Sequence, residues 1–552
     1  MEDEEYNEEL RRRLLILRDY FKEGKISISK DIDIEGSLTA MKYDSDGKVD
    51  LSTVDAKARS LALAVTAMHD REEMKEDIPL HDIQETYFNY IESSFGKHYQ
   101  LMKEKGLDPD AIGRIISSKE EYRDEILPSI PEFVNVIKEY WEIAGEPAWA
   151  HMEDMNCLKG IFGGDLFPSF EENIASKCGI YTDTIIIPDP FVRSAELFER
   201  WSDEDKVYYF MKHATSVLEY KELALADVET PIVVILPDPA KQDQSHMEFI
   251  QRLGMDDVLI HGLHLFGREF ESFEEYMDFC SYLDTPEKVL SELKEKERLI
   301  FDTKWGNSAQ EQLKMAIEAG DTPQLLGTTH PGIIVGRSGF GRMAQANEIL
   351  IKSRRFRGVP LIDAPTSWQY LDWKLEYDSE RIDIHHLEDM HVTRGLQNLA
   401  RGEMQWLGKV PPSALIEVRR EGALDEIRNI LSTGISELVE LNPHNYHRSS
   451  DQIFENLHNA FDEHKNNIKE LTNKKWKFAG SDIGSWLAIG TLEVTAAATG
   501  MPVYGISAIA ANQLMDVPKL KDIPEKFRKI AEEDEKVKKS PVGLLFKYGN
   551  KP

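Results

Sequence analysis

The first part of the chain changes from a helical to an extended hydrophobic pattern. Apolar residues recur every three or four positions at Leu10, Leu14, Leu17 and Phe21, which predicts an amphipathic helix. A half-buried strand is predicted by the alternation of polar residues with Ile26, Ile28, Ile32 and Ile34. A second extended stretch ends at Tyr43, and Asp46-Gly47 before residues 48–51 indicates a hairpin turn. Residues 54–150 are mostly helical and acidic in pattern.

The middle third contains short apolar runs separated by helical stretches. The runs that we predict to be strands are residues 184–187, 231–236, 258–260 and 332–335. The first two each lead into a Pro-Asp-Pro sequence, which contains Asp189 and Asp238 respectively. Continuous apolar strands that alternate with helices are typical of a mostly parallel sheet buried on both faces.

The last third is predicted to be helical after Pro411-Pro412. Ser413 is a suitable N-cap, and apolar residues then recur at helical spacing at Leu424, Ile427, Leu431, Ile435 and Leu438. The whole pattern predicts a mixed, helix-rich α/β protein with a central, mostly parallel sheet. The expected domains are a mainly helical region with a small β-hairpin at 1–150, an α/β domain at 151–365 and a mainly helical domain at 366–552.

Residues 483–515 form an apolar segment with a single charged residue, Glu493. Pro502 follows Gly500 near its middle and divides it into two pieces, each too short to cross a bilayer alone. We interpret the segment as a buried helical hairpin packed through small residues, and membrane insertion is the alternative.

Composition narrows the class of protein. The 552 residues include 66 Lys and Arg against 99 Asp and Glu, which gives a formal charge of −33. Such a charge argues against a protein that binds nucleic acid or anionic lipid over its whole surface. The acidic N-terminus does not resemble a secretory signal, and three dispersed cysteines fit a reducing compartment, so we expect a cytoplasmic protein.

Residues 331–363 form the most informative segment. We interpret it as a strand at 332–335, a glycine loop at 336–341, a helix at 343–356 and a strand at 359–362. From Arg337 to Arg357 six basic residues stand against one acid, so this window carries a charge of +5 within the acidic chain. A glycine loop before a helix lets backbone N–H groups approach an anion. The expected ligand-binding residues are Gly336, Arg337, Ser338, Gly339, Gly341, Arg342, Arg354, Arg355 and Asp363.

Several interpretations of this segment compete. A P-loop requires GxxxxGK[ST], and the Lys-Ser/Thr pair is absent. A dinucleotide site requires GxGxxG, whereas the glycines here follow GxxGxG and the chain turns helical after Asp363. A general phosphate or nucleic-acid contact fits the loop and the arginines. In the remaining interpretation the glycines make a tight turn and the arginines pair with acidic surfaces of the same protein.

Acidic and histidine residues supply the candidates for catalysis. Asp189, Asp238 and Asp363 follow predicted strands and are suited to Mg²⁺ beside a bound phosphate, although Asp between prolines is also favourable turn chemistry. His330, just before the glycine segment, is the candidate general base. A separate cluster at residues 385–391 could hold a metal or form a polar helix surface; it contains His385, His386, Glu388, Asp389 and His391.

The functional hypothesis is therefore that the central domain binds a phosphate-bearing ligand, either a nucleotide or a nucleic-acid backbone. Hydrolysis or transfer would place His330, Asp189 and Asp238 in catalysis, with Mg²⁺ as the candidate cofactor. Two alternatives remain open. One is a helical interaction or scaffold protein without catalysis, which needs a protein partner. The other is a regulated effector, defence- or toxin-like, whose apolar hairpin perturbs membranes.

Overall fold

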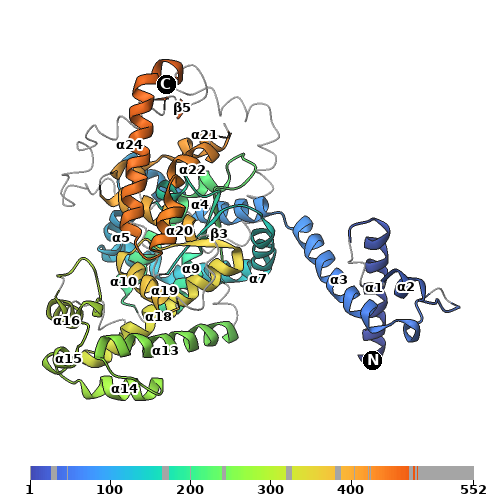
Figure 1. Ribbon diagram of the computed structural model, residues 1–552, viewed down its shortest axis with the longest axis horizontal. Helices are drawn as coiled ribbons and strands as arrows, with labels where there is room; N and C mark the ends of the chain where they lie inside the picture. Colours follow the sequence, from blue (N-terminus) through green and yellow to red (C-terminus); the bar gives the residue numbers. More distant parts are fainter. Residues whose placement is uncertain are drawn as a thin grey trace. The chain divides into compact units, whose positions relative to one another are not determined.

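The structure is a computed structural model in which helices predominate over strands (Figure 1). The residues that it describes are 2–26, 34–45, 48–164, 173–198, 201–238, 244–306, 308–318, 326–378, 387–402, 404–420, 422, 424–471, 477–478 and 481–482. The chain divides into two compact units, of which the first contains residues 1–83 and 143–154, and the second residues 84–142 and 155–552. The three-domain division expected from the sequence stays a prediction.

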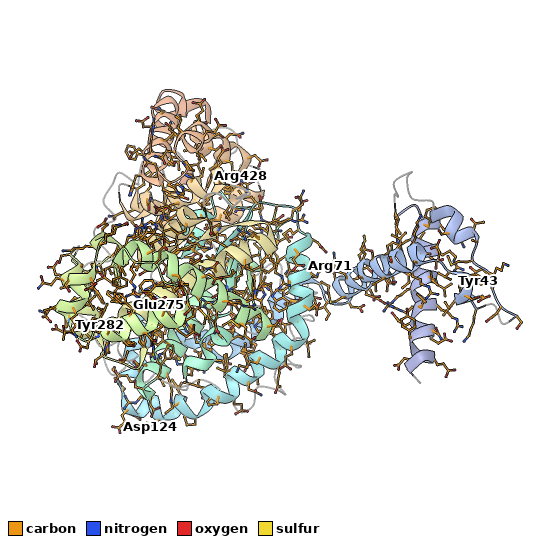
Figure 2. All side chains as sticks on the ribbon, turned by 60° about the horizontal axis from the view of Figure 1, so that its bottom comes forward. Tyr43, Arg71, Asp124, Glu275, Tyr282 and Arg428 are labelled. Atoms are coloured by element: carbon orange, nitrogen blue, oxygen red, sulfur yellow. The ribbon has the colours of Figure 1, made fainter. Side chains whose placement is uncertain are left out.

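The first unit is built on the predicted N-terminal helix. Its helices are α1 (Glu2–Lys22), α2 (Ile34–Thr39) and α3 (Ala56–Asp77), with a 3-10 turn η1 (Leu51–Thr53). Leu10, Leu14 and Leu17 of α1 are buried against α3, which confirms the amphipathic pattern. On α3, Arg71 pairs with Glu153 at 2.8 Å and with Asp154 at 3.0 Å (Figure 2).

The predicted hairpin is seen only in part. Tyr43 and Val49 form an antiparallel bridge, and the Asp44 N–H donates to the Lys48 carbonyl at 2.8 Å. Asp46-Gly47 and residues 27–33 lie outside the described residues. Ile34, expected at the end of a strand, begins the helix α2 instead.

The second unit contains a parallel sheet of four strands. They are β1 (Lys159–Phe162), β2 (Thr184–Pro188), β3 (Val233–Leu236) and β4 (Gly358–Leu361), arranged in the order β3-β2-β1-β4. Every residue of the four strands is buried, as expected for a sheet covered on both faces. The predictions of a mixed, helix-rich α/β fold and of strands at 184–187, 231–236 and 359–362 are confirmed.

The remaining elements of the chain are mostly helical. They are α4 (Leu80–Glu104), α5 (Pro109–Ser117), α6 (Glu120–Ile126), η2 (Leu127–Ser129), α7 (Ile130–Asp154), α8 (Ile174–Cys178), α9 (Pro190–Phe198), α10 (Asp203–Leu218), α11 (Lys221–Ala224), α13 (Gln244–Phe266), α14 (Phe273–Tyr282), α15 (Pro286–Glu292), η3 (Lys296–Arg298), α16 (Ala309–Glu318), α18 (Pro331–Phe356), α19 (Pro365–Tyr377), α20 (Leu387–Arg401), η4 (Gln405–Lys409), α21 (Pro412–Arg420), α22 (Leu424–Ser432), α23 (Ile435–Leu441), α24 (Tyr446–Leu471) and the short strands β5 (Lys477–Phe478) and β6 (Ser481–Asp482).

The described part of the chain between Pro412 and Leu471 is mostly helical, as predicted, although Ser413 lies inside α21 and is not its N-cap. The apolar segment 483–515 lies outside the described residues. Within the part of the chain that the structure describes, the helices lack a stretch apolar and long enough to cross a bilayer.

Two predicted strands are wrong. Residues 258–260 lie inside α13, and residues 332–335 lie inside α18, which packs along α13 (Figure 1). Runs of three or four apolar residues cannot be assigned to strand or helix by periodicity alone, and here the long helices prevail. The expected glycine loop at 336–341 is therefore also helical.

The glycines of α18 permit close packing between helices. Gly332 and Gly336 face α14, where a Cβ on Gly332 would lie 2.0 Å from the Cys280 carbonyl oxygen. Gly339 faces Val258 of α13 at ordinary contact distance, whereas Gly341 has open space around it.

We expect alanine substitutions at Gly332 and Gly341 to change the free energy of unfolding in opposite directions. Gly332→Ala should lower the free energy of unfolding by about 1–3 kcal/mol, because the backbone of α14 must move. Gly341→Ala should raise it by about 0.5–1 kcal/mol through helix propensity alone. Urea denaturation of both variants measures this, and equal effects would contradict the packing role of Gly332.

Candidate functional site

The strand order has a switch point, at which successive strands are added on opposite sides of β1. From β1 the chain proceeds to β2 and β3 on one side, and it later returns to place β4 on the other side of β1. Open parallel sheets bind ligands beyond the carboxyl ends of their strands at such a switch point. Asp189, Asp238 and Asp363 follow β2, β3 and β4 within two residues, so the predicted acids do lie at this edge.

Asp189 has a structural role. Its Oδ1 accepts hydrogen bonds from the N–H groups of Phe191 at 2.7 Å and Val192 at 2.9 Å, and its Oδ2 accepts one from Trp141 Nε1 at 2.8 Å. Burial raises the pKa of Asp189, and these donors offset part of that rise. The geometry matches the turn interpretation of Pro-Asp-Pro, since Asp189 satisfies the first N–H groups of α9.

Asp238 belongs to a buried network of four charges. It contacts Arg193 at 2.7 Å and Lys352 at 2.6 Å, and Glu348 contacts both of these cations. Burial by itself would raise the pKa of Glu348, but Arg193 and Lys352 lower it well below the usual range. Lys352 of the basic window is therefore paired with acids of the same chain.

Asp363 forms the third charge cluster, at the end of β4. Its Oδ1 lies 2.8 Å from the Nζ of Lys177 on α8 and 2.9 Å from the Nη2 of Arg401 on α20. Arg401 also donates to the backbone carbonyl of Asp363. The Lys177 and Asp363 side chains are buried, whereas the Arg401 side chain keeps 30% of its surface exposed.

The end of β1 lies directly beside this cluster. Gly163 and Gly164 follow β1, and the Gly163 N–H donates to the Leu361 carbonyl of β4 at 3.1 Å. Gly164 has a φ of +76°, and a Cβ there would lie 2.6 Å from Ile362. Glycine is favoured here because of the left-handed backbone, and a Cβ would in addition displace the Ile362 side chain.

One face of α20 carries a row of hydrogen-bond donors. Arg394, Gln397 and Arg401 lie three, four and seven positions apart, so they share a face of the helix, and α20 packs against β4 and α8. Arg394 is only 7% exposed and Gln397 only 1%. Among the described residues, neither Arg394 Nη1 nor Gln397 Nε2 has a hydrogen-bond partner.

Arg394 is a buried cation for which no ion pair is found among the described residues. Its guanidinium lies 4.3 Å from the ring centre of Trp368 on α19. Burial and, to a smaller extent, Arg401 lower its pKa to about 9, although Asp363 and Asp372 act in the opposite direction. A guanidinium nitrogen without an acceptor in this setting loses the hydrogen bonds that water would supply.

The basic window is divided between distant places. Arg342 donates to the Ser367 hydroxyl in the first turn of α19, beside the end of β4. Arg337 is exposed and donates to the Leu326 carbonyl at 2.7 Å, and Ser338 is half-buried on the next position of the helix. Gly336 and Gly339 lie in helix contacts, so the predicted loop of backbone donors is wrong.

Arg354 and Arg355 are not brought together with the acids. Both are exposed in the last turn of α18, just before β4 begins, whereas Asp363 follows the end of β4. The four residues of β4, at about 3.3 Å each, put about 13 Å between these two edges of the sheet.

His330 is also placed away from the strand-end acids. It is the N-cap of α18, where its Nδ1 accepts a hydrogen bond from the Ile333 N–H at 3.3 Å. Twelve helical residues separate it from Arg342, which corresponds to about 18 Å along the axis. A role for His330 as a general base stays a prediction.

In the described part of the histidine-rich stretch, the side chains make packing contacts and hydrogen bonds within the protein. His385 and His386 lie outside the described residues. His391 is buried, stacked on Tyr446 with 4.2 Å between ring centres, and bonded to Ser449 at 2.8 Å. Asp389 accepts from the Tyr181 hydroxyl at 2.7 Å.

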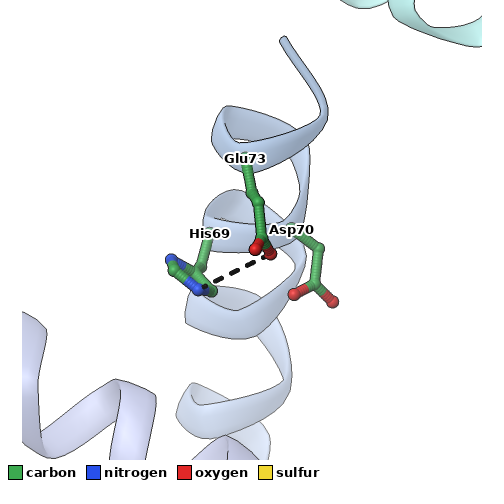
Figure 3. A group of neighbouring side chains, drawn as sticks. All are labelled: His69, Asp70 and Glu73. Atoms are coloured by element: carbon green, nitrogen blue, oxygen red, sulfur yellow. Dashed lines mark ion pairs between the residues drawn. The ribbon is translucent and has the colours of Figure 1, made fainter. Parts of the chain in front are cut away.

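A different group has metal-ligand spacing. Within the described ranges, His69, Asp70 and Glu73 of α3 are the one set of three such residues whose ligand atoms lie within 4.8 Å of one another (Figure 3). His69 Nε2 is 4.0 Å from Glu73 Oε2, and Asp70 pairs with Arg12. Asp189, Asp238 and Asp363 do not form such a set, so the structure does not gather them around one Mg²⁺.

Sequence reasoning missed Lys177, Arg394, Gln397 and Arg401. The spacing of three, four and seven places the last three on one helix face, but a polar helix face is ordinarily exposed to solvent, so this spacing did not indicate a buried site. In comparisons with known proteins, no family model, curated protein or solved structure matches this chain.

Proposed function

We propose that this chain binds a small phosphate-bearing ligand at the carboxyl edge of its sheet, where β1 and β4 end. The observation that carries the proposal is Arg394, a buried cation whose Nη1 has no acceptor among the described residues. An oxyanion would supply the missing acceptor and compensate the buried charge.

Neighbouring groups support the same ligand chemistry. Gln397 offers a second donor without an acceptor in the described part of the chain, and Arg401 presents a half-exposed guanidinium on the same helix face. The N-terminus of α19 begins beside Asp363 with no side-chain cap and no acid in its first turn. Partial positive charge at that terminus favours an anion next to these cations.

The burial of the donors favours a small molecule over a nucleic-acid backbone. A duplex contacts side chains on an open surface, and a chain of net charge −33 repels it at longer range. Arg394 and Gln397 are instead covered by helices. The proposed function is therefore the binding of a small phosphate compound. The proposal does not include a catalysed reaction.

Inorganic phosphate is the simplest probe. A melting experiment on the whole chain should show stabilisation that saturates with phosphate, reaching about 2.7 kcal/mol at 100 times the dissociation constant. Potassium chloride at equal ionic strength should have no such effect. Arg401→Gln should weaken the response at least tenfold, because the variant loses a cation of the site.

The exposed pair Arg354→Gln and Arg355→Gln is the matched control, since it removes two positive charges at the opposite edge of the sheet. Its phosphate response should equal that of the unmodified chain. A response lost in this control and kept in Arg401→Gln would refute the site proposed here.

A further inference from the structure

Beside the strand-end site, three polar side chains form a second cluster with unused hydrogen-bonding capacity. They come from three helices: Asp372 from α19, Arg394 from α20 and Tyr446 from α24. Asp372 Oδ1, Arg394 Nη1 and Tyr446 Oη are all buried atoms without a hydrogen-bond partner in the described part of the chain. Other buried polar atoms of the described residues, such as Thr66 Oγ1 and Thr184 Oγ1, share this condition, but here three such groups interact with one another.

Aromatic contacts hold the cluster together. Arg394 covers the face of Trp368, and Tyr446 packs against the same ring in a T-shaped arrangement with 5.1 Å between ring centres. The helices α20 and α24 lie side by side (Figure 1). His391 stacks on Tyr446 with 4.2 Å between ring centres.

The charges around the cluster define its two ends. Arg394 interacts electrostatically with Asp363 and Arg401 of the strand-end site and also with Asp372 and Tyr446, so it belongs to both groups. At the far end, Asp372 Oδ1 lies 3.8 Å from His444 Nδ1, which is ion-pair distance when that histidine is protonated, and Glu376 adds a second carboxylate. The Asp372 and His444 side chains are 27% and 38% exposed, which gives this end access to solvent.

We infer that Asp372 and Tyr446 recognise the hydroxyl groups of a sugar attached to the phosphate. This inference rests on the proposed function and names its ligand class as sugar phosphates, including nucleotides. A carboxylate accepts hydrogen bonds from neighbouring hydroxyls, and a tyrosine hydroxyl both donates and accepts. Arg394 beside Asp372 disfavours a cationic group in the same position.

The test compares inorganic phosphate with ribose 5-phosphate by isothermal titration calorimetry. The unmodified chain should bind ribose 5-phosphate at least tenfold more tightly than phosphate. Asp372→Asn should reduce this preference to threefold or less while phosphate affinity stays the same or rises. Tyr446→Phe removes only one hydroxyl and should reduce the preference about threefold, which keeps the test available if Asp372→Asn fails to fold.

The outcomes separate the two proposals. Equal affinity of the unmodified chain for both compounds overturns the sugar site and leaves phosphate binding intact. Equal loss of both affinities in Asp372→Asn also overturns it, because Asp372 would then act only by orienting Arg394. Absence of binding by either compound overturns the proposed function itself.

Discussion

Replacing Arg394 with methionine is expected to abolish stabilisation by phosphate without lowering the stability of the chain alone. Methionine fills a similar volume against Trp368, and its introduction removes a buried guanidinium whose Nη1 has no acceptor among the described residues. Replacing buried charges by apolar groups of similar volume is often neutral or stabilising by about 1–4 kcal/mol. Thermal and urea unfolding with and without phosphate measure both quantities.

Arg419→Met is the matched control for this experiment. Burial lowers the pKa of Arg419 to about 10, and its Nε, like Arg394 Nη1, has no hydrogen-bond partner among the described residues, but its Nη2 donates to the Thr182 carbonyl at 2.7 Å. Its loss should cost about 1–3 kcal/mol and leave the phosphate response unchanged. If Arg394→Met instead destabilises the chain as Arg419→Met does and keeps the phosphate response, Arg394 is structural.

Asp238→Asn is expected to lower the free energy of unfolding by about 3–5 kcal/mol, the usual cost of breaking a buried ion pair. The substitution leaves Arg193 and Lys352 with Glu348 as their remaining carboxylate in this network. Urea denaturation measures the loss.

An exposed pair provides the comparison for Asp238→Asn. Asp284 and Lys288 lie 2.9 Å apart at the surface, and Asp284→Asn should cost no more than about 1 kcal/mol. A similarly small effect of Asp238→Asn would show that the buried network does not depend on that charge.

The hydrophobic pattern predicted the strands whose signals are local. The runs at 184–187 and 231–236 are continuous, β-branched and bounded by proline, and both are strands of the sheet. β1 was not predicted because it contains Lys159 and Gly160, which interrupt the apolar run. Lys159 is buried, and its Nζ donates to the Phe356 carbonyl at 2.9 Å, a contact nearly two hundred residues away in sequence.

The candidate site was predicted in one respect and misplaced in another. Acids after parallel strands must lie at the carboxyl edge, and Asp189, Asp238 and Asp363 do. The glycine-rich segment has a composition that suits a loop, yet its glycines lie in a helix because α13 and α14 approach it closely. Interhelical distance is not encoded in local spacing.

The sequence by itself therefore determined the helix-rich α/β class, the positions of three strands and the edge at which the acids gather. These properties follow from the periodicity of burial along a helix or strand, which is local. Only the tertiary structure decided which charges meet. Lys352 pairs with Asp238, Lys177 and Arg401 meet Asp363, and Arg394 is buried beside Trp368. Ion pairs form between groups that are close in space, and in this chain the paired groups belong to segments far apart in sequence. Local sequence patterns therefore cannot predict them.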